Sequence, residues 1–398
     1  MARNITVGID IGTYQIKVVV AELVKENGKN VTRIIGTGLT ESKGLRHGYI
    51  INSPDVTASI RSAIGLAEKT SGVKIQKAFI AVGGIGLSGI TSTASLIIGR
   101  ADLQITELDI EKIAEVCEES LPVSVTQNQR VLHSIPLSYK IDGKIVLAKS
   151  PLDMKGTKLE VKMLFVTSLE AHLNDLLEAV DKAGVEVVDV LASPIAASFV
   201  TLTKTQKMAG VILTNIGAET VSIIIFENNI PISLEVFPIG SNDITNDIAL
   251  GLKIPLEEAE NIKIRGIGGS SGNTTMSKKK LEDIISARLA DMFELIENHL
   301  KKIGRNGLLP AGIFITGGGA SYGTTIEDFA KVALKLPSRI ATMNVGGEKS
   351  YIKDSTWAVA YGLCMLGLSK EEKTNLGIRH TMNKAGGKIF DWLKQFLP

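Results

Sequence analysis

The sequence contains few residues that could cross-link the chain or ligate a metal ion. Only two cysteines, Cys117 and Cys364, occur among 398 residues, so no disulfide framework is expected and a reducing compartment fits the composition. The five histidines show no ligand spacing such as H-x-x-x-H, which argues against a metal site. They are His47, His133, His172, His299 and His380.

Excess charge and long apolar runs are missing as well. The formal net charge is +2, and the charged residues are spread along the chain, so the electrostatic footprint of a nucleic-acid-binding protein is absent and no nucleic-acid partner is expected. Asp10 interrupts the first apolar segment and nowhere do eighteen apolar residues follow one another, so neither a signal peptide nor a transmembrane helix is expected. Hydrophobic residues nevertheless make up 44% of the chain, which excludes a disordered or fibrous protein.

Strand and helix patterns alternate along the chain. The segment Ile5–Leu23 places β-branched runs on either side of a Gly-Thr turn, which predicts a hairpin at the start of a sheet. Apolar residues recur with helical spacing at Asp55–Thr70, Thr106–Ser120 and Leu169–Ala183. This alternation predicts an α/β protein.

The hairpin pattern occurs twice. Residues 10–20, DIGTYQIKVVV, align with residues 215–225, NIGAETVSIII, at an offset of 205 residues. A polar residue and a glycine stand at equivalent positions of both turns, which predicts two copies of one sheet-based fold facing each other across a cleft. Since short hairpins often share a glycine turn, this match alone leaves a chance likeness open.

A third glycine turn strengthens the pattern. Residues 312–320, GIFITGGGA, form an apolar strand that runs into a glycine turn, and a helical pattern resumes near Thr325. Glycine permits close approach and unusual dihedral angles, so the backbone amides of such turns suit phosphate groups. Two hairpin turns followed by a strand-to-helix turn therefore indicate a phosphate-binding cleft.

With these motifs the sequence resembles the actin, Hsp70 and sugar-kinase superfamily and, within it, the FtsA family of bacterial cell-division proteins. The likeness to FtsA covers nearly the whole chain and includes four segments in the family's order. These are GLRHGYIINSPDVTASI (44–60), RVLHSIPLSYKIDG (130–143), PIGSNDITNDIA (238–249) and EEAENIKIRG (257–266).

The resemblance implies a duplicated actin-like ATPase (ribonuclease-H-like) fold of the α/β class, with two lobes around a nucleotide cleft. It implies a first core of residues 1–83 and 166–193, an inserted FtsA-type subdomain of 84–165, and a second core of 194–226 and 309–368. A peripheral subdomain (227–308), a flexible linker (369–388) and a C-terminal amphipathic helix (389–398) complete the expected organisation.

The resemblance also implies ATP and Mg²⁺ as cofactors. Asp10 matches the carboxylate that holds magnesium through water, while Gly12 and Thr13 match the turn against the β- and γ-phosphates. Lys17 stands where the superfamily often places a phosphate-facing lysine, although a solvated strand lysine is the alternative. The other implied nucleotide-binding residues are Tyr14, Asn215, Gly217, Ala218, Glu219, Gly240, Glu260, Lys263, Gly318, Gly319 and Ala320.

Two of these assignments carry alternatives. Glu260 and Lys263 lie three residues apart on one helical face, where an ordinary surface ion pair is the commoner outcome and therefore the alternative. The second turn departs from the family's Asp and G-G-G-T pattern, because Asn215 replaces the Asp and GAET occupies residues 217–220. A neutral amide removes a negative charge near magnesium, and Glu219 brings a carboxylate close to phosphate oxygens unless its side chain turns away. We therefore expect slow or absent hydrolysis with ATP binding retained.

The C-terminal tail has the pattern of a membrane anchor. Residues 369–388 are polar and have no apolar face, which predicts the linker. In the final segment the apolar side chains fall within an arc of about 160°, and lysines flank that face. A helix that packs on the protein's own core is the alternative. The predicted membrane-binding residues are Lys388, Ile389, Phe390, Trp392, Leu393, Lys394, Phe396 and Leu397.

The resemblance implies a cytoskeletal adaptor that polymerises and tethers filaments of the tubulin-like FtsZ to the inner face of the cell membrane. Its implied partners are the FtsZ C-terminal tail, other copies of itself, anionic lipids, and other division proteins through the inserted subdomain. Lys280 and Arg288 are candidates for binding the acidic FtsZ tail, with solvated basic residues as the alternative. A small-molecule kinase and a type IV pilus adaptor are the competing functions; the kinase lacks a recognisable substrate-side Asp motif here, and the pilus adaptor lacks the terminal helix.

Overall fold

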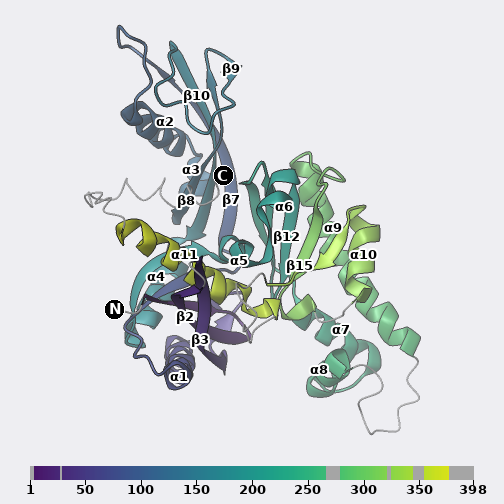
Figure 1. Ribbon diagram of the computed structural model, residues 1–398. Helices are drawn as coiled ribbons and strands as arrows, with labels where there is room; N and C mark the ends of the chain where they lie inside the picture. The colour runs from purple at the N-terminus through teal and green to yellow at the C-terminus, as the bar shows by residue number, and fades with distance from the viewer. Residues whose placement is uncertain (1–3, 27–28, 266–277, 321–323, 344–353, 376–398) are drawn as a thin grey trace.

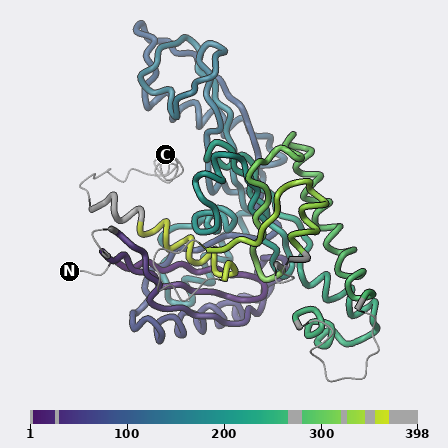
Figure 2. Tube along the Cα trace, turned by 45° about the vertical axis from the view of Figure 1, so that its right-hand side comes forward, coloured from purple at the N-terminus to yellow at the C-terminus, as the bar shows by residue number. Residues whose placement is uncertain are grey.

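The computed structural model describes residues 4–26, 29–265, 278–320, 324–343 and 354–375. Two of its sheets have five strands each and form the bases of two lobes, and a four-stranded sheet forms a smaller body that projects away from them (Figures 1 and 2). Among the helices of these residues, none combines the length and the apolar character needed to span a membrane.

The sheet of the first lobe has the strand order β11-β6-β1-β2-β3. The predicted hairpin is confirmed, because β1 pairs antiparallel with β2, and β1 also runs parallel to β6. A separate small hairpin, β4–β5, follows β3. The strands are β1 (Ile5–Ile11), β2 (Gln15–Glu26), β3 (Lys29–Glu41), β4 (Leu45–Arg46), β5 (Tyr49–Ile50), β6 (Lys77–Val82) and β11 (Glu186–Ala192).

The second lobe repeats this topology. Its sheet has the order β14-β13-β12-β15-β16, with the same antiparallel meander and the same parallel crossovers as the first lobe. The predicted duplication is thereby confirmed. The strands are β12 (Val211–Ile216), β13 (Val221–Glu227), β14 (Ile230–Phe237), β15 (Gly312–Thr316) and β16 (Ser338–Ile340).

Two predicted domain boundaries do not match the sheets. The boundary at 226/227 assigned residues 230–237 to the peripheral subdomain, but these residues form β14, the third strand of the core meander. The boundary at 165/166 falls inside β10, which stays paired in the inserted sheet as far as Leu169. Strand pairing decides both boundaries: β14 continues the core meander from β13 through the two-residue turn 228–229, and β10 keeps its pairing with β8 as far as Leu169.

Helices cover both lobes and connect them. The predicted helices near residues 55–70, 106–120 and 169–183 are confirmed as α1, α2 and α4. The first lobe and its connections carry α1 (Ser53–Ser71), α4 (Glu170–Lys182), α5 (Ser193–Thr201) and α6 (Lys204–Ala209). The second lobe carries α7 (Ser241–Leu252), α8 (Leu256–Arg265), α9 (Lys278–Lys302), the 3₁₀ turns η1 (Gly318–Ala320) and η2 (Ser355–Trp357), and α10 (Thr324–Leu334).

The last helix of the described residues, α11 (Ala358–Asn375), crosses the middle of the molecule against α5 and β1 (Figure 1). The crossing with α5 is close, because a Cβ at Gly362 would lie only 1.9 Å from the carbonyl oxygen of Ala196. The helix also continues seven residues into the segment 369–388 that was predicted to be a linker, so that prediction is wrong for residues 369–375. Lys and Glu favour helix, which lets a helix that is buried at its start extend into a polar sequence.

The inserted subdomain has its own sheet, in the order β7-β10-β8-β9, and its own core, which includes Ile105, Ile113 and Phe165. It projects from the lobes at the top of Figure 1, and its base packs against β14 of the second lobe. Its elements are β7 (Leu87–Ile97), α2 (Glu107–Glu119), α3 (Val123–Thr126), β8 (Gln129–Ile141), β9 (Lys144–Ile145) and β10 (Lys158–Leu169).

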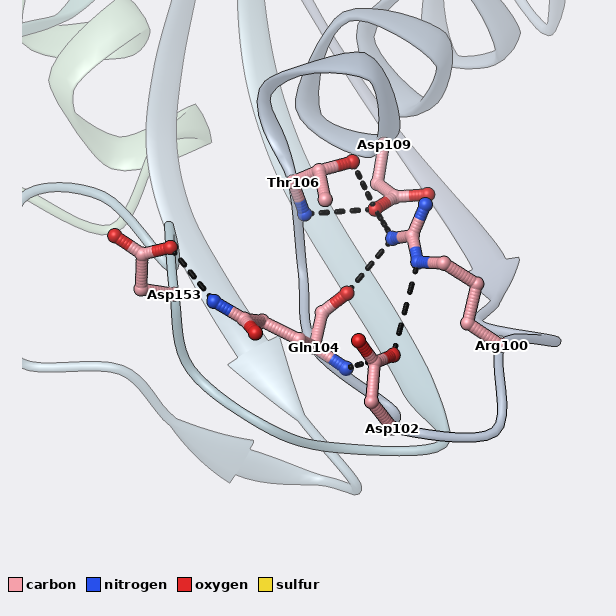
Figure 3. Close-up of polar contacts among 6 residues, drawn as sticks. All are labelled: Arg100, Asp102, Gln104, Thr106, Asp109 and Asp153. Atoms are coloured by element: carbon pink, nitrogen blue, oxygen red, sulfur yellow. Dashed lines mark hydrogen bonds and ion pairs between the residues drawn. The ribbon is translucent and has the colours of Figure 1, made fainter.

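A polar network orders the loops at the far end of this subdomain (Figure 3). The Asp109 carboxylate accepts hydrogen bonds from the Thr106 backbone N–H and hydroxyl, at 2.8 and 2.7 Å, and pairs with the Arg100 guanidinium. Partial burial opposes the Asp109 charge, but these contacts outweigh it and hold the pKa of Asp109 below its usual value. Gln104 extends the network to Asp153 at 2.9 Å, so the start of α2 is tied to the neighbouring loop.

Candidate functional site

A cavity of about 990 Å³ lies between the two lobes. Both hairpin turns line it, together with the turn after β15, the β4–β5 loop and parts of α7 and α8. The structure therefore brings together residues that are more than 300 positions apart in sequence. The predicted site residues in its lining are Asp10, Gly12, Thr13, Tyr14, Lys17, Asn215, Gly217, Ala218, Glu219, Glu260, Lys263 and Gly318.

The first turn joins β1 to β2. Asp10 and Lys17 are direct partners across this hairpin, so their side chains leave the same face of the sheet. The Gly12 N–H donates to the Gln15 carbonyl at 3.2 Å and closes the turn. Lys17 Nζ donates to the Thr356 carbonyl at 2.9 Å, which holds the lysine at the cavity wall.

Burial dominates the electrostatics of this pair. It raises the pKa of Asp10 to about 6, although the Lys17 charge opposes the shift. Burial likewise lowers the pKa of Lys17, and Asp10 and Asp354 act against that change. The Asp10 carboxylate is therefore only partly compensated by its neighbours, and a bound cation would favour its ionised form.

The second turn has the same backbone and different side chains. Its Gly217 N–H donates to the Thr220 carbonyl at 2.8 Å, as Gly12 does in the first turn. Asn215 and Ser222 occupy the places of Asp10 and Lys17. The second turn therefore contributes neither charge of the Asp10–Lys17 pair.

The adjoining turn after β15 requires glycine. Gly317 has a φ of +94°, and a Cβ there would lie 2.3 Å from Asn215 Oδ1. Neither the backbone nor the available space accepts a side chain, so the Asn215 amide packs directly on this backbone.

Glu219 of the second turn contacts His47 on the other side of the cavity. Its carboxylate accepts a hydrogen bond from the backbone N–H of His47, and its carbonyl oxygen lies 3.2 Å from His47 Nδ1. The second lobe is thereby joined to the β4–β5 loop of the first. Sequence reasoning did not select His47, although it lies in the FtsA-like segment 44–60.

Two predicted glycines, Gly240 and Gly319, pack against the second turn outside the cavity lining. A Cβ at Gly240 would lie 2.4 Å from the Ala218 carbonyl, and one at Gly319 would lie 2.4 Å from Ile216 Cγ2. Neither glycine is part of the cavity lining. Ala320 ends η1, the 3₁₀ turn that follows Gly317.

Glu260 and Lys263 on α8 form a partly buried network with α7. Lys263 Nζ lies 2.6 Å from Glu260 Oε2 and 2.7 Å from Thr245 Oγ1, and the lysine side chain is only 7% exposed. The Thr245 hydroxyl also bonds to the Glu260 carboxylate. The alternative of an ordinary surface ion pair is therefore wrong for Lys263, because the pair lies against α7 at the cavity wall.

His172 on α4 is a cavity residue that sequence reasoning missed. It is 3% exposed, its ring packs edge-on against Tyr49 at 5.0 Å, and its Nδ1 has no hydrogen-bond partner. Burial lowers the pKa of His172, while a hydrogen bond with the Gly83 backbone and the Asp175 charge oppose the shift. A single histidine on the buried face of a helix gives no sequence signal that separates it from a core residue.

The predicted partner-binding residues lie on α9. Arg288 donates two hydrogen bonds to the Asp247 carboxylate, at 2.6 and 3.0 Å, and lies 3.2 Å from an Asp291 oxygen. These contacts direct Arg288 towards α7, whereas Lys280 is exposed. The predicted membrane-binding residues lie outside the described residues.

Solved structures with the same fold were found by comparison of the whole chain. The PilM–PilN type IV pilus biogenesis complex matches with a TM-score of 0.63 at 17% identity and covers 91% of this chain and 98% of that one. MreB5 of Spiroplasma citri bound to AMPPNP matches with a TM-score of 0.55 at 13% identity and covers 94% and 99%. At these identities the likeness shows an actin-like fold and nothing finer.

Sequence comparison goes further. The family model described as cell division protein FtsA matches residues 212–362, and the model described as the SHS2 domain inserted in FtsA matches residues 84–167. The chain is 30% identical to cell division protein FtsA of Borreliella burgdorferi over 98% of each chain. It is also 30% identical to FtsA of Pseudomonas aeruginosa, over 92% of this chain and 89% of the relative, and to FtsA of Bacillus subtilis, over 91% and 83%. The chain therefore belongs to the FtsA family of cell-division proteins.

Proposed function

We propose that this FtsA-family protein binds ATP with Mg²⁺ between its lobes and that it polymerises and tethers FtsZ filaments to the inner face of the cell membrane. One observation carries the nucleotide part: two turns of the same backbone geometry face a single cavity, and Asp10 and Lys17 stand together at its wall. The cell-division part follows from the family.

The cavity fits a nucleotide in size and in the placement of its polar groups. Its volume of about 990 Å³ lies at the upper end of the range of ligand pockets, about 300–1,000 Å³. Lys17 and the glycine turns lie at the ends of interior strands of the two sheets, where they would face phosphates. Glu260 and Lys263 line the wall formed by α8, where family resemblance places the nucleoside.

The residues at the first turn also fit magnesium. Mg²⁺ prefers carboxylate oxygens and water, and Asp10 is a half-buried carboxylate at the cavity wall whose raised pKa reports incomplete compensation of its charge. When bound, the ion would neutralise phosphate charge. Asp10 would hold it through water, and Lys17 would supply a second positive charge at the same wall.

We expect this site to hydrolyse ATP slowly or not at all. Asn215 stands at the position where the family usually has a second carboxylate, and it packs against Gly317 without any charge. Losing one preorganised electrostatic contact costs about 3 kcal/mol in the transition state, or roughly a hundredfold in rate. Ground-state binding loses less, because Asp10, Lys17 and the turn amides remain.

A thermal-shift measurement tests nucleotide binding. Millimolar ATP with Mg²⁺ should raise the melting temperature, since a ligand at 100 times its Kd stabilises the native state by about 2.7 kcal/mol. Asp10→Ala should reduce the shift, and Asp181→Ala, which removes an exposed carboxylate outside the cavity, should leave it intact. The absence of a shift in the natural chain would remove the nucleotide site.

Liposome pelleting tests the membrane part. Trp392→Glu or Phe396→Glu places a carboxylate in the predicted apolar arc, so pelleting with anionic vesicles should be lost. Gln395→Glu adds the same charge on the polar arc of the same segment and should reduce pelleting much less. Undiminished pelleting of a folded Trp392→Glu variant would contradict the membrane assignment.

Binding of the FtsZ tail is the remaining part of the proposal, and Lys280 and Arg288 are its candidate residues. Arg288 is already paired with Asp247, so Lys280 on the exposed start of α9 is the better candidate for an acidic peptide. Lys280→Glu should weaken binding of an FtsZ tail peptide in fluorescence anisotropy, whereas Lys182→Glu on α4 should not. Equal binding by both variants would place the tail elsewhere.

A further inference from the structure

The β4–β5 loop occupies a junction between three parts of the molecule. His47 and Gly48 form its two-residue turn with φ values of 48° and 87°, and Arg46 pairs with Tyr49 across it. Positive φ at both positions is the geometry of a tight hairpin turn, which leaves the backbone N–H and C=O of His47 available to other elements. Both groups are used, and in different directions.

The N–H of His47 faces the second lobe. It donates to the Glu219 carboxylate, and the His47 ring lies 3.2 Å from the Glu219 carbonyl through Nδ1. A hydrogen bond from an amide to a carboxylate is charge-assisted and therefore stronger than one between neutral groups. Glu219 also lines the cavity, so any charge bound there acts directly on this contact.

The C=O of His47 faces the inserted subdomain. It accepts a hydrogen bond from Ile85 N–H at 3.2 Å, and a Cβ at Gly48 would lie only 2.4 Å from Gly84 Cα. Residues 83–86 lead into β7, and the Gly86 carbonyl accepts from Leu169 N–H at the end of β10. We call residues 83–86 the root of the inserted subdomain, because both of its chain connections meet there.

One residue, His47, thus connects the second hairpin turn to the root. The equivalent position in the first turn is Tyr14, whose side chain is 56% exposed at the cavity. The cross-lobe carboxylate is therefore a feature of the second turn alone. Glu219 occupies a position where the FtsA pattern has glycine. The contact with His47 therefore exists because this sequence departs from that pattern.

We propose that Glu219 is a clasp that holds the root of the inserted subdomain through His47, and that phosphates bound in the cavity loosen it. The inference rests on the proposed ATP binding. Phosphate oxygens in the same cavity repel the Glu219 carboxylate, which weakens its hold on His47 N–H. By linkage, the clasp disfavours the phosphates to the same degree that the phosphates open the clasp.

Two variants separate the hydrogen bond from the charge. Glu219→Gln keeps an oxygen that accepts from His47 N–H but removes the charge that phosphates repel. Glu219→Gly removes both, and glycine suits a turn of this kind. Equal far-UV circular dichroism of the three proteins shows that each is folded.

Hydrogen–deuterium exchange of the full chain is the test. Without nucleotide, Glu219→Gly should speed exchange at residues 84–90 by roughly tenfold, the factor that one charge-assisted hydrogen bond provides. Glu219→Gln should change it by less. Residues 110–117 of α2, remote from the root, should exchange at the same rate in all three proteins. Millimolar Mg–ATP should speed exchange at 84–90 in the natural chain and have little effect in Glu219→Gln.

Three results would overturn the inference. Equal exchange at 84–90 in the natural chain and Glu219→Gly, without nucleotide, would show that Glu219 does not hold the root. A thermal shift with Mg–ATP that leaves exchange at 84–90 unchanged would show binding without release of the clasp. The absence of any thermal shift would overturn the proposed nucleotide site and, with it, the nucleotide-driven release, which distinguishes that failure from the first two.

Discussion

The two hairpin turns at the cavity share a backbone but not a chemistry. Each is closed by a glycine N–H that donates to a carbonyl three residues on, and each lies between the first two strands of a five-stranded sheet with the same topology. The first turn holds Asp10 and Lys17, whereas the second holds Asn215 and Ser222 and directs Glu219 to the other lobe. Duplication thus preserved the geometry that suits phosphates, while the charges that suit magnesium remain on one side.

The largest effect, on the rate of ATP hydrolysis, is expected when the second turn receives the carboxylate that the first turn has. Asn215→Asp places a carboxylate opposite Asp10, and phosphate release at saturating Mg–ATP with lipid present should rise roughly a hundredfold. Asn246→Asp, which adds the same charge to α7 elsewhere in the cavity lining, is the matched control and should have little effect. A natural rate of several turnovers per minute that Asn215→Asp leaves unchanged would show that the asymmetry does not limit hydrolysis.

The Asp10 carboxylate of the first turn is expected to lower the stability of the nucleotide-free protein. Because burial raises the pKa of Asp10 above its unfolded value, the folded protein binds this proton more tightly, and its stability falls as the pH rises from about 4 to about 6. Above pH 6, Asp10→Asn should therefore stabilise the nucleotide-free protein by roughly 1–3 kcal/mol, and the gain should vanish near pH 4. Urea denaturation at both pH values measures it.

A control fixes the interpretation of that result. Asp181→Asn makes the same change at an exposed carboxylate of the first lobe, outside the cavity, and is the matched control. Equal stability of the natural protein and Asp10→Asn at pH 7 would mean that Lys17 compensates the Asp10 charge in full.

The Lys17 charge of the first turn is expected to strengthen ATP binding. Lys17→Met removes the positive charge of the first turn and should weaken ATP binding about tenfold, since a charge-assisted contact to phosphate is worth about 1.4 kcal/mol or more. Ser222→Ala changes the equivalent residue of the second turn and should alter affinity by less than about twofold, because a neutral contact is weaker. Calorimetric titration with Mg–ATP gives both values, and equal losses would argue that the turns act alike.

The smallest effect is expected on α8, where the second lobe carries its own charged pair. Thr245→Val removes a hydroxyl that bonds to both Glu260 and Lys263, and should lower the free energy of unfolding by about 1 kcal/mol. Thr324→Val, at the first residue of α10, is a control for the same chemical change. A loss below the error of urea denaturation would mean that Glu260 and Lys263 satisfy each other without Thr245.

Local patterns determined much of this structure. The glycine turns at 12 and 217, the strand-to-turn segment 312–320 and three amphipathic helices follow from residue spacing alone, because they depend on dihedral preferences and on one buried face. The internal match between residues 10–20 and 215–225 likewise indicated a duplicated sheet. These features concern neighbours in sequence, where propensity acts directly.

Tertiary packing decided the rest. The buried start of α11 carried the helix into a polar segment that by composition resembled a linker. The contact between Glu219 and His47 joins residues 172 positions apart, so no local preference specifies it. The sequence by itself thus determined which turns suit phosphates, whereas only the closure of two lobes on each other decided that Glu219 would bond to His47, because that hydrogen bond forms only when both partners are held in place by their own sheets.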